Sequence, residues 1–170
     1  MIKTALDLAA KFHDNQFDKS NAPYIMHPIR VMLACSTQEE CIVAILHDLI
    51  EDTPLTLEDI RLKGFSEEIV TTLDTLTKRP EEIYDDYIDR ILTDPLACRV
   101  KLADLCDNSD ITRIAKPKKK DLRRLEKYQR AAKRIIKHLR AQNNGILQVQ
   151  TPAGYHGERL KNFLKENSIE

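Results

Sequence analysis

Apolar side chains recur at intervals of three and four along most of the chain, the spacing that places them on one face of an α-helix. The first such stripe consists of Ala5, Leu8, Ala9 and Phe12. Long alternating strand patterns are absent and glycine is scarce, at 4 of 170 residues. Further helices are predicted over about 28–36, 38–50, 56–63, 66–78, 84–93, 95–109 and 121–141. The pattern therefore predicts an all-α domain, a helical bundle with a long C-terminal helix.

The pattern changes after the last of these helices. Residues 146–150 alternate like a short strand, residues 152–157 have the composition of a loop, and residues 160–165 predict a last helical turn or two. We therefore expect one domain over residues 1–141 and a short irregular tail over residues 142–170, to which the sequence assigns no role.

The segment 45–53 places four ionisable side chains in an otherwise apolar run: His47, Asp48, Glu51 and Asp52. His47 and Glu51 lie one helical turn apart, as do Asp48 and Asp52. An unpaired buried charge costs several kcal/mol, so a helix that turns this cluster inward needs a cation or dense hydrogen bonding. A bound metal ion is the simplest explanation.

Two further segments complete such a site. Pro28 suits the first position of a helix and pushes the preceding residue out of the α region, so His27 is expected at a helix entrance. Asp104 and Asn108 share one face of another predicted helix. The candidate metal ligands are His27, His47, Asp48 and Asp104. A mixed nitrogen and oxygen shell suits manganese, iron(II) or zinc better than calcium or magnesium.

Three ordered motifs carry a resemblance to a known family. They are Pro23-Tyr24-Ile25-Met26-His27-Pro28, then His47-Asp48-Leu49-Ile50-Glu51-Asp52-Thr53, then Lys101-Leu102-Ala103-Asp104 followed by Asn108. Together they resemble the metal-binding pattern of the HD phosphohydrolase superfamily, and within it the hydrolase domain of RelA/SpoT-type alarmone enzymes and the free-standing small alarmone hydrolases. The resemblance covers roughly residues 1–115. It implies an HD-domain helical bundle, a manganese ion held by the four candidate ligands, and removal of the 3′-pyrophosphate from ppGpp.

The same resemblance implies roles for further residues. Glu51 and Asp52 would activate the attacking water, and Asn108 would hold the catalytic assembly or the substrate. Lys19 and Ser20 match positions that contact the substrate in the alarmone hydrolases.

One position departs from the family pattern. The alarmone hydrolases carry an arginine that contacts the guanine base where this chain has Asp18. An acidic side chain offers neither a guanidinium fork nor a cation that stacks on a purine. A second hypothesis therefore keeps the reaction and changes the substrate to another nucleotide or phosphoester. A third is a catalytically silent nucleotide-binding module, whose signature would be a lost ligand or a lost Glu51–Asp52 pair.

Charge and composition narrow the partners. Lysine plus arginine equals aspartate plus glutamate at 27 each, so no overall field attracts nucleic acid or an anionic membrane. The basic stretch 113–140 either faces an anionic substrate or forms the solvated side of a helix. No apolar run approaches the ~20 residues of a membrane helix, and the N-terminus does not resemble a signal peptide. We expect a cytoplasmic, stand-alone enzyme with a small nucleotide substrate and reduced, buried cysteines; the sequence does not indicate an oligomeric state.

Overall fold

The computed structural model describes residues 1–114 and 116–168, and this part of the chain forms a bundle of α-helices. In chain order they are α1 (Ile2–Phe12), α2 (Met26–Leu33), α3 (Gln38–Leu46), α4 (Leu49–Asp52), α5 (Leu57–Leu62), α6 (Glu67–Leu76), α7 (Tyr84–Ile91), α8 (Pro95–Asn108), the short 3-10 turn η1 (Ile111–Arg113), α9 (Lys119–Gln142) and α10 (Tyr155–Glu166). Within these residues no strand forms, and β-type pairing is confined to an isolated bridge between Phe17 and Pro23. The all-α fold class is confirmed.

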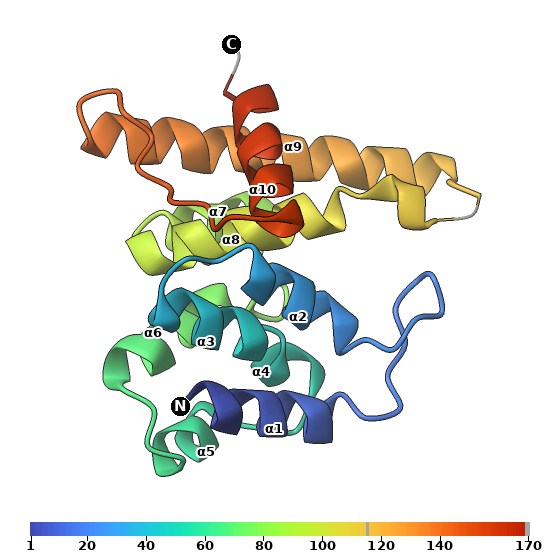
Figure 1. Ribbon diagram of the computed structural model, residues 1–170, viewed down its shortest axis with the longest axis vertical. Coiled ribbons are helices and arrows are strands. Elements are labelled where there is room, and N and C mark those ends of the chain that lie inside the picture. Colours follow the sequence, from blue (N-terminus) through green and yellow to red (C-terminus); the bar gives the residue numbers. More distant parts are fainter. Residues whose placement is uncertain (115, 169–170) are drawn as a thin grey trace.

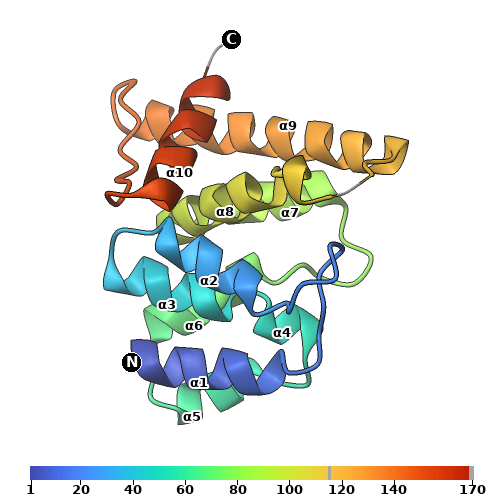
Figure 2. The same ribbon diagram turned by 45° about the vertical axis from the view of Figure 1, so that its right-hand side comes forward.

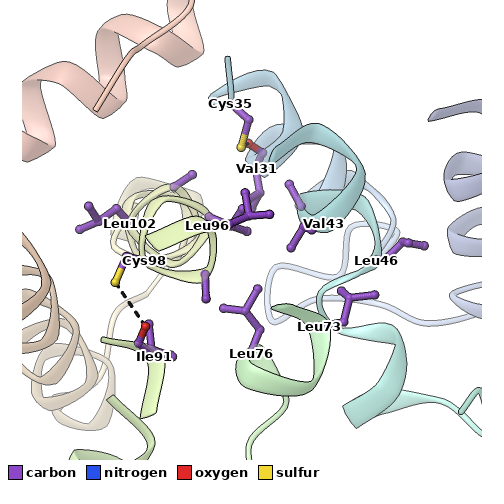
Figure 3. Packing of buried hydrophobic residues seen from close by; sticks show 14 of the residues in the cluster. Val31, Cys35, Val43, Leu46, Leu73, Leu76, Ile91, Leu96, Cys98 and Leu102 are labelled. Carbon is purple, nitrogen blue, oxygen red and sulfur yellow. Dashed lines mark hydrogen bonds between the residues drawn. The ribbon is translucent and has the colours of Figure 1, made fainter. Parts of the chain in front are cut away.

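Helix α8 is the central element of the bundle. It packs against α2, α3, α6, α7, α9 and α10, and its buried side chains lie all round the helix instead of along one stripe. Figure 3 looks into this core, where Leu96 of α8 lies toward Val31 and Val43 of the neighbouring helices, while Leu102 lies on the opposite side of α8. A polar side chain on α8 therefore has to find its partners inside the protein.

The helices are stacked in layers along the long axis of the molecule. In Figure 1, α9 lies above α7 and α8, α1 and α5 lie at the opposite end, and α2 and α3 lie between. Figure 2 shows the same order from another side, with α10 beside α8 at the α9 end. The segments that carry His27, His47 and Asp104 thus meet in the middle layers.

Several helices begin at side chains that satisfy their free backbone N–H groups. Ser66 accepts a hydrogen bond from the backbone nitrogen of Ile69, and Asp94 accepts hydrogen bonds from Leu96 and Ala97, with Pro95 in the first helical position. The starts of the helices predicted over 66–78 and 95–109 are confirmed to within a residue.

The helix expected over 38–50 is two helices. Helix α3 ends at Leu46 and α4 begins at Leu49, with a turn at His47 and Asp48 between them. Both flanking leucines are fully buried, so the apolar periodicity runs through the break and hides it. Helix α2 also begins at Met26, earlier than expected, so His27 lies inside its first turn, not outside the α region.

The C-terminal tail is more regular than expected. Residues 146–150 form no strand, and Leu147 and Val149 instead pack against the core as single side chains. The predicted turn or two is the 12-residue helix α10. Position 157 in this helix is a glycine because a Cβ there would come within 1.7 Å of the Pro152 carbonyl oxygen. In the sequence, a glycine kept for such close packing looks the same as a glycine in a loop. Of this tail, residues 169 and 170 lie outside the described part.

The four cysteines are free thiols; Cys35, Cys98 and Cys106 are buried as expected, whereas Cys41 is half-buried. Burial raises the pKa of Cys98 to about 12, which keeps this thiol protonated. In the part of the chain that the structure describes, no helix has the length and apolar character needed to cross a membrane.

Candidate metal centre and active site

Four predicted side chains converge between the middle layers. His27 comes from the first turn of α2, His47 and Asp48 from the turn between α3 and α4, and Asp104 from α8. One ligand atom each of His27, His47 and Asp104 lies within 4.8 Å of the others. Asp48 lies beside them, since its Oδ2 is 3.2 Å from Nε2 of His47 and 3.5 Å from Nε2 of His27. The four candidate ligands, His27, His47, Asp48 and Asp104, thus form a ring of donor atoms, called the metal ring below.

His47 provides the sharpest test of whether a metal ion fits. Its Nδ1 lies 2.7 Å from the carbonyl oxygen of Ala44 and donates to it, which leaves the lone pair of Nε2 directed into the ring. Nε2 is buried and has no hydrogen-bond partner among the described residues, and carboxylate oxygens of Asp48 and Asp104 lie 3.2 and 3.7 Å away. A lone pair that faces two carboxylates is unfavourable unless a positive charge lies between them. The donor set therefore fits a divalent cation.

His27 is oriented from behind by an acid that the motifs did not single out. Its Nδ1 lies 2.8 Å from Oδ2 of Asp107, while its Nε2 lies 3.2 Å from Oδ1 of Asp104. Asp107 is buried and also accepts hydrogen bonds from Arg30 at 2.8 and 3.1 Å. Despite burial, the contacts with His27 and Arg30 hold the pKa of Asp107 below its usual range. A carboxylate behind a histidine fixes which ring nitrogen faces a metal.

The ring carries more negative charge than its surroundings neutralise. Burial alone would lower the pKa of His27, but hydrogen bonds to Asp104 and Asp107 raise it to about 10. Burial also opposes the charged form of Asp104, yet Lys101, whose Nζ lies 2.7 Å from its Oδ2, holds its pKa well below the usual range. Without a metal, protons on the histidines supply the missing positive charge; a bound cation would replace them.

A cavity of about 400 Å³ opens beside the ring, within the size range of small-molecule sites. It is lined by Phe17, Asp18, Lys19, Ser20, Tyr24, His27, Asp52, Asn108, Asp110, Arg113, Ile114 and Arg124. The predicted substrate contacts Lys19 and Ser20 thus share one cavity with a predicted metal ligand.

The two acids of α4 have different surroundings. Asp52 lines the cavity, and burial together with the negative charge of Asp48 raises its pKa. Glu51, which is exposed like Asp52, does not line the cavity, and its Oε2 accepts a hydrogen bond of 3.1 Å from the backbone nitrogen of Lys78. The structure brings Asp52 to the cavity, whereas Glu51 contacts the segment after α6.

Two polar side chains hold the carboxylates of the ring. The hydroxyl of Tyr24 donates to Oδ2 of Asp48 at 2.5 Å, and the amide of Asn108 donates to Oδ1 of Asp104. The sequence assigned no role to Tyr24 or to Asp107. Their partners, Asp48 and His27, are 24 and 80 positions away along the chain, so these contacts could be recognised only in the folded structure.

The loop before α2 is organised by Asp18. Its Oδ1 accepts hydrogen bonds from the backbone nitrogens of Ser20 and Ala22, at 2.8 and 3.0 Å, and its Oδ2 lies 3.3 Å from Nη1 of Arg113. The hydroxyl of Ser20 donates to the Arg113 carbonyl oxygen at 2.8 Å. Arg113 and Arg124 line the cavity, although the sequence indicated only the basic stretch to which they belong. Other basic residues of that stretch are exposed: Lys116, Lys118, Lys119, Lys120 and Arg123.

No model of a known protein family matches the chain. A guanosine-3′,5′-bis(diphosphate) 3′-pyrophosphohydrolase of Aquifex aeolicus is 30% identical in an alignment, gaps included, of 185 residues, which covers 98% of this chain and 26% of the relative. The enzyme of the same name from Borreliella burgdorferi is 40% identical over 81 residues, covering 45% of this chain and 12% of the relative. The one from Haemophilus influenzae is 30% identical over 152 residues, covering 78% and 22%. The chain therefore spans about a quarter or less of the length of these relatives.

A solved structure described as "A metazoan ortholog of SpoT hydrolyzes ppGpp and plays a role in starvation responses" superimposes with a TM-score of 0.70. It is 22% identical, and the match covers 98% of this chain and 95% of the other. At that identity the match shows a shared all-α fold. Together with the sequence relatives it confirms the resemblance to RelA/SpoT-type hydrolases.

Proposed function

We propose that the chain is a metal-dependent phosphohydrolase that removes the 3′-pyrophosphate from guanosine 3′,5′-bis(diphosphate), ppGpp. The observation that carries the proposal is the buried Nε2 of His47, which faces Asp48 and Asp104 beside a cavity of nucleotide-binding size. The relatives from Aquifex aeolicus and Haemophilus influenzae are named for this reaction. Because the chain matches only about a quarter of each, the proposal assigns it the hydrolase reaction alone.

In this proposal His27, His47, Asp48 and Asp104 hold the metal, and the metal is manganese, which accepts mixed histidine and carboxylate shells. When bound, such a cation supplies Lewis acidity toward a phosphate oxygen and lowers the pKa of water. Tyr24 and Lys101 fix the two carboxylates by contacts of 2.5 and 2.7 Å. The ligand geometry is thus set before a substrate arrives.

Positive side chains supply a reason to expect a polyphosphate. Arg124 lines the cavity, and burial together with the charges of Lys101, Arg124 and Lys78 lowers the pKa of Lys127. A pKa lowered by like charges places these cations within electrostatic reach of one another. A group of cations in one region favours a ligand with several negative charges.

The proposed reaction adds one water and breaks one ester bond. The water oxygen bonds to the phosphorus attached to the 3′-oxygen, the bond between that phosphorus and the 3′-oxygen breaks, and the 3′-oxygen takes up a proton. The products are guanosine 5′-diphosphate and inorganic pyrophosphate. Asp52, in the cavity wall, accepts the proton of the attacking water, and Asn108 keeps Asp104 in place.

Glu51 stays a proposed catalytic acid on the strength of the resemblance. Its carboxylate also anchors the backbone of Lys78, one of the cations that act on Lys127, so its effect on catalysis includes the position of that segment. Lys19 and Ser20 are the proposed substrate contacts of the loop before α2, and both line the cavity.

The second candidate function keeps this chemistry and changes the nucleotide, and Asp18 in the loop is the observation that favours it. Product analysis separates the two. The manganese-loaded protein and an Asp48→Ala control are incubated with ppGpp and with a panel of ordinary nucleotides. Metal-dependent release of pyrophosphate from ppGpp supports the proposal. Release of phosphate from other nucleotides, with ppGpp unchanged, supports the second candidate, and stoichiometric manganese without turnover on any phosphoester supports a silent binding module.

The division into a hydrolase domain over 1–141 and a tail over 142–170 stays part of this proposal. Helix α10 of the tail packs against α8 and α2, and Arg159 on it lies 3.1 Å from Oδ2 of Asp110, a cavity residue. The cytoplasmic location predicted from the sequence likewise stays a prediction.

A further inference from the structure

We propose that Arg113 contacts the nucleobase of the substrate and makes the site prefer guanine, and that Asp18 is the residue that positions Arg113. The inference rests on the proposed nucleotide hydrolase function and concerns the substrate that this chain selects. It assigns to a residue after α8 the guanidinium that the loop before α2 lacks.

The carboxylate of Asp18 is occupied by the protein itself. One oxygen accepts hydrogen bonds from two backbone nitrogens of its own loop, and the other lies 3.3 Å from Nη1 of Arg113. Only 14% of its side chain is exposed. Asp18 therefore joins its loop to η1 across 95 positions of the chain and leaves little of its own charge for a ligand.

Arg113 is fixed at two ends. Nη2 donates to the carbonyl oxygen of Asp107 at 2.7 Å and lies 3.3 Å from Oδ2 of the same residue, while Nη1 donates to Asp18. The hydroxyl of Ser20 holds the Arg113 backbone from the loop side. A guanidinium held in this way loses little side-chain freedom when it binds a ligand. Nη1 carries two protons and has one acceptor within the described part of the chain, so it can donate a further hydrogen bond.

The surroundings of Arg113 suit a purine base. Arg113 and Phe17 line the same cavity as His27, and the Phe17 ring is 60% exposed. A nucleobase can stack on this aromatic ring or on a guanidinium plane. Oδ2 of Asp107 contacts both Arg113 and His27, so the guanidinium lies one residue away from the proposed metal ring.

The chemistry of the guanidinium selects between purines. Guanine presents two acceptors, O6 and N7, on one edge, whereas adenine presents a donor and an acceptor there. The free Nη1 proton of Arg113 can donate to O6 of guanine, whereas adenine carries at that position an amino donor, which cannot accept it. We therefore expect the chain to bind guanosine nucleotides more tightly than adenosine nucleotides, with Arg113 as the cause.

The test compares binding of guanosine 5′-diphosphate and adenosine 5′-diphosphate to the manganese-loaded protein by titration calorimetry. Arg113→Ala is expected to weaken binding of the guanosine ligand by about ten-fold or more and to bring the two affinities together. Arg113→Lys keeps the charge but cannot contact Asp18 and Asp107 at once, so its donor is not held in place and the preference should be lost as well. It also keeps the proposal testable if the alanine variant fails to fold. Arg61→Ala removes a surface arginine paired with Glu58 and Glu67 and serves as the matched control.

Asp18→Asn tests the positioning role. Asparagine keeps an oxygen for the loop nitrogens and removes the charge that faces Arg113. We expect a smaller loss of guanine preference, and no additional loss when Asp18→Asn is combined with Arg113→Ala, because both changes act through one guanidinium. Additive losses would contradict the positioning role.

Two failures are distinguishable. If the wild-type protein releases pyrophosphate from ppGpp and Arg113→Ala keeps the wild-type preference, the inference is wrong and the proposed function stands. If the wild type releases no pyrophosphate but Arg113→Ala removes a preference for guanosine 5′-diphosphate, the proposed function is wrong and the inference stands. A wild type that binds both ligands equally overturns the inference.

Discussion

The carboxylate of Asp107 should be needed for tight metal binding although it is not a proposed ligand. The change to test is Asp107→Asn, which keeps the size of the side chain and removes its charge. Asp107 touches His27 at 2.8 Å and Arg30 at 2.8 and 3.1 Å, and only 4% of its side chain is exposed. Without this charge, His27 loses the acceptor that orients its imidazole, and the partly buried guanidinium groups of Arg30 and Arg113 lose a carboxylate partner.

Two magnitudes follow from these contacts. Removing one partner of a buried ion pair costs about 3–5 kcal/mol of unfolding free energy, and we expect the lower end because asparagine still offers an oxygen. Removing the carboxylate behind a metal-binding histidine costs about 10–100-fold in metal affinity, or about 1.4–2.8 kcal/mol. The first loss reports on packing, and only the second reports on the metal site.

A matched variant separates the two losses. Glu40 is also buried, accepts a hydrogen bond of 2.6 Å from Arg99, and lies on α3 away from the cavity. Glu40→Gln should lower the free energy of unfolding, measured in urea without metal, by a similar amount. Manganese affinity, measured by titration calorimetry, should fall in Asp107→Asn and stay unchanged in Glu40→Gln. Wild-type manganese affinity in Asp107→Asn would refute the reasoning.

Three further changes test other parts of the account. Asp52→Asn should lower kcat for ppGpp by about 100- to 10,000-fold, as expected for the loss of a general base. Glu51→Gln should lower kcat less, because glutamine keeps an oxygen for the Lys78 backbone. Equal losses of kcat in steady-state assays would contradict this division of roles. Removing metal with a chelator should lower the melting temperature, and adding manganese at 100 times its Kd should restore about 2.7 kcal/mol; a calorimetric scan that does not respond to manganese would refute metal binding to the folded state. Gly157→Ala should cost about 1–3 kcal/mol in urea unfolding, because the added Cβ meets the Pro152 carbonyl oxygen, and an unchanged midpoint would show that α10 adjusts freely.

The convergence of the candidate metal ligands could be expected from the sequence, because the polar residues concerned stand out in local patterns. His47 and Asp48 stand in an apolar run that continues on both sides, and Asp104 lies on a helix with buried side chains all round. A polar side chain in such a segment needs a compensating partner, and that requirement can be stated before the fold is known. The helices themselves follow from the same apolar periodicity.

The residues behind the ring could not be predicted in this way. His27 and Asp107 are 80 positions apart, and Asp18 and Arg113 are 95 apart, so neither pair leaves a trace in local spacing. The same limit explains the errors in secondary structure. The break at His47 leaves the burial of Leu46 and Leu49 unchanged, and the alternation at residues 146–150 comes from side chains that pack singly where no strand lies alongside in the described part of the chain.

The most direct test of the central claim is a ³¹P NMR time course of ppGpp with the manganese-loaded protein, with Asp48→Ala as the control. The account predicts that resonances of inorganic pyrophosphate and guanosine 5′-diphosphate grow together in equal amounts, and that the variant or a chelator abolishes both. Orthophosphate as the first product, or unchanged ppGpp with a protein that retains manganese, would contradict it.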